Sequence, residues 1–476
     1  MPSTGDESVV THDCYYNPSH ARRPGHETFS SSRTRWIFFA LGICVLLPWN
    51  VMINEMTYFV SKLEHSAYQD AFPSYLSASM SLANFAFMIH ATFYATSTPS
   101  RIRINRSILI VIAMLVVLTI SPLFPFSGGL FFSIIILNGV IQSAAGSYFQ
   151  TAVVGIAALF GSSALQSHFS GQAASGVVVS AIQFVSVLVS AKNESKDIAS
   201  LALPPSQSFS ASLFFGVTTL CMAMALVAHS ALQQTPSYHA VVLTFEQSKG
   251  TIVEVVGREE VPEENQPFIS QDVQVHISST VKVSDMAWTN AVYNVAVAYV
   301  FIVTLSVFPP ITSSIYSVNQ GTGWVLTQPA LFVSLHFLIF NVGDWLGRHL
   351  CTYPQLLVWS PQKLAILSFC RTIFIPIFLV CNVNGVSSPA SLGTVIINSD
   401  ILFLIIVLMF GTSNGYLASM IMAAASSIKH NPILKKEQIE GAATVAQFFL
   451  IGGILVGSIF SFLVKHLICR CNPFYA

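Results

Sequence analysis

The chain has 476 residues, no net charge and a charged fraction of only 9%, whereas a soluble domain carries about 25% charged residues. This composition excludes an ordinary soluble enzyme, and the balanced charge indicates no nucleic-acid partner. The sequence contains neither a phosphate-binding glycine loop nor a His/Cys/Asp cluster at metal-ligand spacing. It therefore predicts a protein that crosses the lipid bilayer several times and has no metal site, no cofactor and no catalytic residues.

The polar segment 1–35 lacks the apolar core and cleavage site of a signal peptide, and we interpret it as a disordered cytosolic tail. Beyond it, apolar windows long enough to cross a bilayer as helices predict an all-α integral membrane protein with eleven transmembrane helices. The windows are 36–59, 74–97, 107–124, 130–159, 169–190, 209–231, 286–308, 328–348, 364–382, 400–424 and 441–464. We expect an N-terminal six-helix bundle at 36–231, a C-terminal five-helix bundle at 286–464 and a short non-cytosolic tail at 465–476.

The positive charges in the connections predict the orientation of the chain. Most Lys and Arg residues fall in connections on the same side as the N-terminus, which indicates a cytosolic N-terminus and an outer C-terminus. In this orientation the long polar connection 232–285 is a cytosolic loop, and Asn193 begins a glycosylation sequon on the outer side.

The eighth window contains the strongest polar signal of the chain. Asn341, Asp344 and Arg348 are three and four residues apart, so that on a helix they share one face. Ionisable groups within a membrane span tend to face the protein interior or a wet cavity. Two interpretations stay open here: a binding site for the hydroxyl groups of a solute, or a structural ion pair.

Two other windows offer groups suited to a flat polar solute. In the first window, Trp49 beside Leu46 and Asn50 is either a stacking surface for a ring or an interfacial tryptophan at a helix kink. In the fourth window, Gln150 either hydrogen-bonds a solute or holds two helices together, and Gly146 one turn earlier makes room.

Other residues have simpler interpretations. Gly171 permits close helix approach, and Phe308 is either an outer gate or the end of a helix. Arg371, nearly alone in an apolar run, needs a partner, for which Asp344 and Asp400 are the alternatives. Three Gly-x-x-x-Gly pairs, Gly343/Gly347, Gly411/Gly415 and Gly453/Gly457, are typical of packing surfaces.

These motifs together resemble one family. Leu46-Leu47-Pro48-Trp49-Asn50 resembles the first-span signature of equilibrative nucleoside transporters, and Phe340-Asn341-Val342-Gly343-Asp344-Trp345-Leu346-Gly347-Arg348 resembles their eighth-span signature. The segments Ser170-Gly171-Gln172, Ser413-Asn414-Gly415-Tyr416 and Glu440-Gly441 are similar to parts of the fifth, tenth and eleventh spans. The likeness covers about 36–464, apart from the central loop.

The resemblance implies a major-facilitator-like 6+5 arrangement whose halves rock around a central site, and facilitated diffusion of nucleosides such as adenosine and uridine, in some members of nucleobases. It implies that Trp49 lines the site against the base, that Gln150 hydrogen-bonds the base, and that Asp344 and Arg348 hold the ribose. The neighbours of these groups would be Leu46, Asn50 and Asn341, with Gly146 and Gly171 serving packing and fit. It also implies the plasma membrane rather than a vacuole or lysosome.

The alternative function is proton-coupled nucleoside transport across an acidic intracellular membrane. Its motivation is a set of carboxylates in or near the spans, namely Glu55, Asp344, Asp400 and Glu440. Glu55 stands where many family members have uncharged residues, and Gly343 replaces a bulkier one, which predicts a wider site.

Overall fold

The computed structural model describes residues 31–63, 66, 69, 72–93, 98–124, 126–194, 207–247, 283–309, 311–320, 324–382 and 396–469. Most of the predicted 1–35 tail, of the 232–285 loop and of the 465–476 tail lies outside the described residues. Within the described residues the secondary structure is helical, and 11 helices are long and apolar enough to cross a membrane. The predicted fold class and the predicted number of spans are therefore confirmed.

The first six spans belong to continuous helices. They are α1 (Ser32–Asn54), α3 (Phe72–Phe93), α4 (Ser100–Ile120), α5 (Gly128–Phe160), α6 (Ser162–Glu194) and α7 (Gln207–Gln233). Short elements connect them: α2 (Met56–Lys62), η4 (Ser121–Leu123), α8 (Pro236–Tyr238) and η5 (His239–Leu243). The start of the predicted polar loop is thus helical, and Tyr238 is buried there.

Four of the last five spans are single helices: α11 (Ala291–Val307), α12 (Pro329–Leu350), α15 (Asp400–Ala425) and α16 (Ile439–Cys469). The ninth span is broken into three pieces, α13 (Pro361–Cys370), η9 (Arg371–Ile373) and α14 (Phe374–Leu379). The shorter elements are α10 (Val283–Thr289), η6 (Thr312–Ser314), η7 (Val325–Thr327), η8 (Pro354–Leu356) and η10 (Lys436–Gln438). The ninth span is broken because Pro376 has no N–H to donate to the carbonyl of Thr372, so the preceding turn tightens at η9.

Two predicted boundaries differ from the structure. The third window opens at residue 107, but α4 begins at Ser100, so that Arg101, Arg103 and Arg106 lie in its first two turns and not in a connection. A hydropathy window stops at the first charges, whereas the helix continues beyond the hydrocarbon core. Asn193 falls at the end of α6, and Ser195 of its sequon lies outside the described residues.

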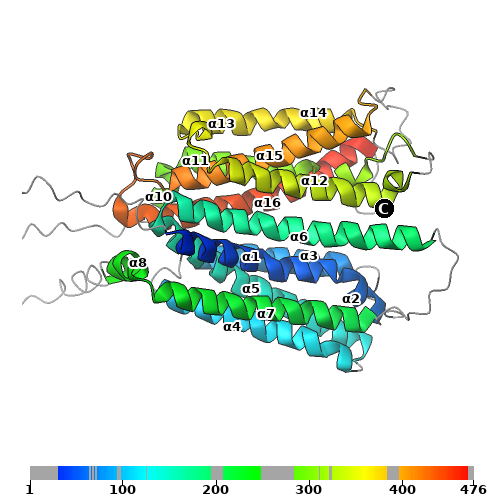
Figure 1. The fold of residues 1–476 in the computed structure, drawn as a ribbon, viewed down its shortest axis with the longest axis horizontal. Coiled ribbons are helices and arrows are strands. Elements are labelled where there is room, and N and C mark those ends of the chain that lie inside the picture. The colour runs from blue at the N-terminus through cyan, green and yellow to red at the C-terminus, as the bar shows by residue number, and fades with distance from the viewer. Residues whose placement is uncertain are drawn as a thin grey trace, which may run out of the picture.

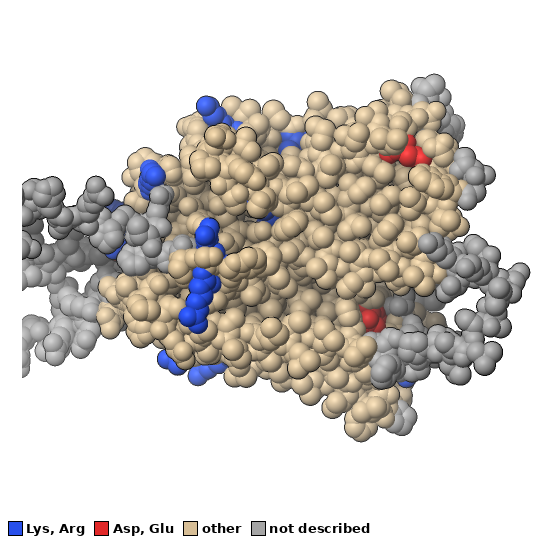
Figure 2. Space-filling model, viewed as in Figure 1, with Lys and Arg blue, Asp and Glu red and all other residues tan. Residues whose placement is uncertain are grey.

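Helix α6 lies between the two halves of the molecule. Figure 1 shows the long helices lying roughly parallel, with α6 between α12 of the C-terminal half and α1 of the N-terminal half. In Figure 2, most Lys and Arg side chains on the visible face gather toward the end near α8, as the positive-inside rule expects if that end is cytosolic.

Glycines allow the closest helix crossings. At the crossing of α12 and α15, a Cβ added to Gly347 would lie 2.1 Å from the Thr412 carbonyl oxygen, and one added to Gly415 would lie 1.9 Å from the Asp344 carbonyl oxygen. Gly453 meets the Ala298 carbonyl oxygen of α11 in the same way. The predicted packing role of these glycine pairs is confirmed.

Gly343 belongs to the same crossing. A Cβ there would lie 2.6 Å from the Leu408 carbonyl oxygen, so the missing side chain brings α15 close to α12. The expectation that Gly343 widens a binding site is therefore wrong, because this position faces a neighbouring helix backbone.

The substitution Gly415→Ala is expected to lower the thermal unfolding temperature of the purified protein strongly. The new methyl group would overlap backbone atoms, and overpacking of this kind costs about 1–3 kcal/mol or more. The matched control is Gly452→Ala in α16, where the nearest atom, Phe85 Cε2, is 4.0 Å from the added Cβ. Equal unfolding temperatures for the two variants in a detergent melt would contradict the role of Gly415.

Candidate functional site

The polar centre of the protein is built around Asp344. Its Oδ2 accepts a hydrogen bond of 2.9 Å from Arg348 Nε one turn later on α12, and both side chains are buried. Its Oδ1 accepts a second bond of 2.7 Å from Asn414 Nδ2 of α15. The close glycine crossing of α12 and α15 brings these groups within reach. The predicted helical pairing of Asp344 and Arg348 is present.

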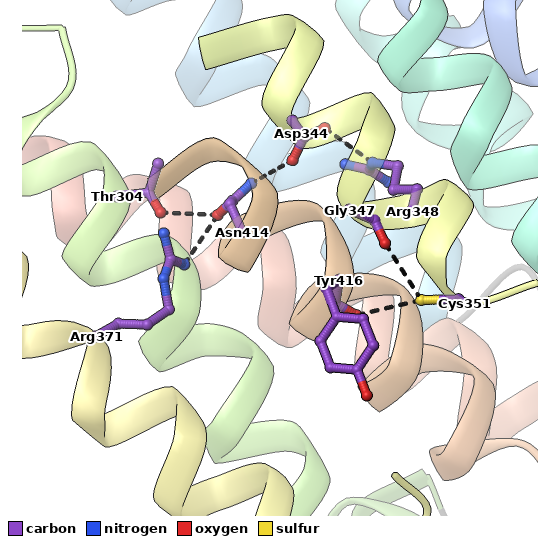
Figure 3. Close-up of polar contacts among 8 residues, drawn as sticks. All are labelled: Thr304, Asp344, Gly347, Arg348, Cys351, Arg371, Asn414 and Tyr416. Atoms are coloured by element: carbon purple, nitrogen blue, oxygen red, sulfur yellow. Dashed lines mark hydrogen bonds and ion pairs between the residues drawn. The ribbon is translucent and has the colours of Figure 1, made fainter. Parts of the chain in front are cut away.

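Asn414 links this pair to the other helices of the C-terminal half. Its Oδ1 accepts a hydrogen bond of 3.0 Å from Arg371 Nη1 and lies 2.8 Å from the hydroxyl of Thr304 on α11. Figure 3 shows Thr304 and Arg371 on one side of the Asn414 amide and Asp344 on the other. One neutral side chain thereby connects three others, from α11, α12 and the broken ninth span.

Arg371 is fixed by neutral oxygens. Besides Asn414, it donates to the carbonyl oxygens of Val300 at 3.1 Å and Phe410 at 3.3 Å. Its guanidinium carbon lies 4.8 Å from the centre of the Phe410 ring, a cation–π distance. Of the two predicted partners, Asp344 is therefore reached only through Asn414.

Asp400, the other predicted partner, belongs to a different cluster. Its carboxylate accepts hydrogen bonds from Ser317 Oγ, the Val318 backbone N–H and Asn319 Nδ2, at 2.7, 2.9 and 2.8 Å. It stabilises the start of α15 and the connection after α11, and it is not the partner of Arg371.

Two residues of α12 contact the N-terminal half through α6. The guanidinium of Arg348 lies 5.9 Å from the centre of the Phe169 ring. Asn341 is half-buried, and its Oδ1 would lie 2.6 Å from a Cβ added to Gly176. The eighth-span residues therefore sit where the two halves meet.

The first-span residues approach α6 from the other side. Asn50 Nδ2 donates a hydrogen bond of 3.1 Å to Ser175 Oγ of α6. Leu46 and Trp49 are partly buried against the apolar core. Gly171 brings α1 and α6 together, because a Cβ there would lie 2.0 Å from the Phe39 carbonyl oxygen. No contact within the described part of the chain joins Trp49 directly to Asp344 or Arg348.

Gln150 and Gly146 lie one turn apart on the same face of α5. Gln150 is only 6% exposed. A Cβ added to Gly146 would meet nothing within 4 Å, so there is open space beside this turn. A largely buried amide, with a donor and an acceptor, next to open space is suited to a polar solute.

Phe308 ends α11 and packs on α12. Its ring stacks on Phe340 with centroids 4.0 Å apart and contacts Phe337 at 4.9 Å. Phe308 thus connects the end of α11 to the eighth span, an arrangement compatible with both a gate and a simple helix end.

One contact between the halves could not be predicted from the sequence. Arg103 Nη2 of α4 and Glu440 Oε1 of α16 are 3.1 Å apart, and both residues are buried. Gly155 of α5 borders this pair, since a Cβ there would lie 2.8 Å from Glu440 Cγ. The pair ties α4 to α16 at the end of the bundle where α4 begins, and its only sequence signal was two charges at opposite ends of the chain.

The arrangement defines a class of protein. Polar groups distributed over several spans, at the boundary between two helical halves, are typical of an alternating-access carrier. The fold agrees: the Escherichia coli fucose:proton symporter matches with a TM-score of 0.50 at 13% identity, over 92% of this chain and 94% of that chain. The protein is a multi-pass membrane protein whose helices have the major facilitator arrangement.

The sequence comparisons give the family. The chain is 24% identical to equilibrative nucleoside transporter 1 of Homo sapiens, over 93% of this chain and 99% of that protein. It is 25% identical to equilibrative nucleoside transporter 3 of Rattus norvegicus, over 91% and 88% of the two chains. It is also 25% identical to equilibrative nucleotide transporter 1 of Arabidopsis thaliana, over 89% and 84%. The family described as nucleoside transporter matches residues 134–466, and the chain belongs to this family.

The substitution Asn414→Ala is expected to lower the unfolding temperature because it leaves Asp344 and Arg371 each without one buried hydrogen bond. Loss of such a bond costs about 1–3 kcal/mol. The control is Ser413→Ala, since among the described residues the Ser413 hydroxyl bonds the Phe410 carbonyl of its own helix. If both variants melt like the unchanged protein, Asn414 is not the link between the buried charges.

Proposed function

We propose that this transporter carries nucleosides across the membrane by alternating access, as facilitated diffusion. The observation that carries the proposal is the buried Asp344–Arg348 pair on α12, at the contact with α6, in a chain of the nucleoside transporter family. A carrier for a polar uncharged solute has to replace the hydrogen bonds that the solute loses on leaving water. The pair offers an acceptor and a donor for this exchange.

The proposed roles follow from the free capacity of these groups. Each carboxylate oxygen of Asp344 accepts one protein hydrogen bond, and each can accept another. Arg348 uses Nε for Asp344 and has further N–H donors on its guanidinium. Two neighbouring hydroxyls of a ribose could therefore donate to Asp344 while a ribose oxygen accepts from Arg348.

The base is assigned to the N-terminal half. Gln150 carries both a donor and an acceptor, which fits the edge of a base, and open space lies one turn away at Gly146. Trp49 provides an aromatic surface on α1, which packs against both α5 and α6. A nucleoside bound in this way would touch both halves, as a solute must if its binding is to be linked to their relative movement.

We propose that the Arg103–Glu440 pair holds the two halves together in this conformation, at the end of the bundle where α4 and α16 begin. Opening at that end would require the buried pair to separate, and removing one partner of a buried pair is costly, at about 3–5 kcal/mol. The pair would therefore set how much of the carrier population is closed at this end.

Facilitated diffusion is favoured over proton coupling by the partners of the candidate carboxylates. Asp344 is engaged by Arg348 and Asn414, and Glu440 by Arg103. Asp400 accepts from three donors of the connection after α11. Protonating Asp344 would leave two buried guanidinium groups, those of Arg348 and Arg371, without their nearest carboxylate. Glu55 is half-buried at the junction of α1 and α2 and remains the residue on which proton coupling would depend.

Counterflow of labelled adenosine into proteoliposomes at equal pH on both sides tests the function. We expect saturable exchange that unlabelled uridine reduces and that Asp344→Ala lowers by more than about tenfold, the equivalent of one lost charge-assisted hydrogen bond. The control Asp285→Ala removes an exposed carboxylate on α10 and should leave exchange unchanged. Exchange that appears only with an imposed pH gradient would support the proton-coupled alternative.

A charge exchange tests the bridge between the halves. Arg103→Glu and Glu440→Arg, made singly, place like charges about 3 Å apart and are expected to reduce exchange markedly. The double variant restores opposite charges and should recover a substantial part of the exchange rate. If the double variant is no better than the single ones, the two side chains do not act as a pair during transport.

A further inference from the structure

A groove opens on the surface of the N-terminal half where α3, α4 and α5 meet, with a volume of about 490 Å³. Its walls are mainly apolar and include Phe87, Ile110, Ile141 and Ala144. Phe87 is 39% exposed and Ile110 is 43% exposed. Because these residues lie on membrane spans, the exposed walls would face lipid chains in a bilayer.

One end of the groove is strongly polar and positive. Arg106 is exposed there, whereas Arg103 is only 6% exposed. The Nε atom of Arg103 is buried without a hydrogen-bond partner among the described residues. His90 and Tyr148 also line the groove, and His90 Nδ1 is 2.6 Å from the Tyr148 hydroxyl. Acidic side chains are absent from the described residues that line it.

We propose that this groove binds an anionic phospholipid of the bilayer. Its phosphate would lie between Arg106 and the Nε edge of Arg103, and one acyl chain would follow the apolar walls toward Ile110 and Ile141. Guanidinium groups form strong charge-assisted hydrogen bonds with phosphate, and basic pockets between spans are suited to anionic headgroups. The apolar walls favour a lipid over a soluble anion, because only a lipid covers both parts of the groove.

The buried Nε of Arg103 strengthens this assignment. A buried donor left unsatisfied is costly, and a phosphate oxygen would satisfy it without disturbing the Nη2 contact with Glu440. Arg103 would then contact the lipid with one edge and Glu440 with the other. The lipid site is thereby in contact with the ion pair that ties α4 to α16.

The test is the thermal unfolding of the purified full-length protein in neutral detergent with added dioleoylphosphatidylglycerol or dioleoylphosphatidylcholine. We expect the anionic lipid to raise the unfolding temperature by roughly twice as much as the neutral one, because it binds the folded protein more tightly. Arg106→Gln should remove most of this difference. The control Arg101→Gln removes an equal charge from an exposed side chain of the same helix, beside His229 and Tyr238 and outside the groove, and should keep the difference.

Two further arms make the result decisive. Ala144→Phe fills an apolar part of the groove without changing its charge and should also remove the preference for the anionic lipid. Millimolar inorganic phosphate should not compete with the lipid. The proposal fails if the two lipids stabilise the protein equally, if Arg101→Gln weakens the preference as much as Arg106→Gln, or if inorganic phosphate abolishes it.

Discussion

The structure depends on one physical constraint: a charge inside a membrane protein needs a partner. Three charged side chains, Asp344, Arg348 and Arg371, lie in the centre of the C-terminal half, and a single amide, that of Asn414, connects Asp344 to Arg371. An isolated buried charge would cost several kcal/mol, and a hydrogen-bonded network removes much of that cost. The amide suits this position because it donates to the carboxylate with one end and accepts from the guanidinium with the other, which a carboxylate or an ammonium group could not do.

This network exists because glycines let the backbones come close. Hydrophobic burial does not drive helices together in lipid, so the short distance between α12 and α15 depends on Gly347 and Gly415, where a methyl group would overlap the neighbouring backbone. The crossing of α1 and α6 uses Gly171 in the same way. Since α6 also contacts α12, the two crossings bring candidate site residues of both halves to one boundary.

The sequence was sufficient for the spans and for part of the site. Hydropathy is a property of consecutive residues, so eleven spans could be predicted, and a pair such as Asp344 and Arg348 follows from helical spacing. The partner of Arg371 could not: the sequence left Asp344 and Asp400 as alternatives, and the packing instead places the neutral Asn414 beside the guanidinium. The contact of Arg103 with Glu440 joins residues 337 positions apart, and no local pattern indicates it. The prediction for Gly343 is wrong for the same reason, because the packing of the neighbouring helix decides which atoms a glycine meets.

The charges of the centre also bear on what the carrier can accept. The network holds one carboxylate and two guanidinium groups, so it is positive as a whole, and the described groups around Arg371 are neutral oxygens and a ring face. Such a centre disfavours a cationic solute and favours one with several hydroxyl, ring-nitrogen or carbonyl acceptors, as a nucleoside has. A neutral solute can then enter and leave without changing the charge of the site. The surface groove at Arg106 differs from this centre. Its proposed ligand is an anionic lipid of the bilayer, which is not carried through the transport cycle.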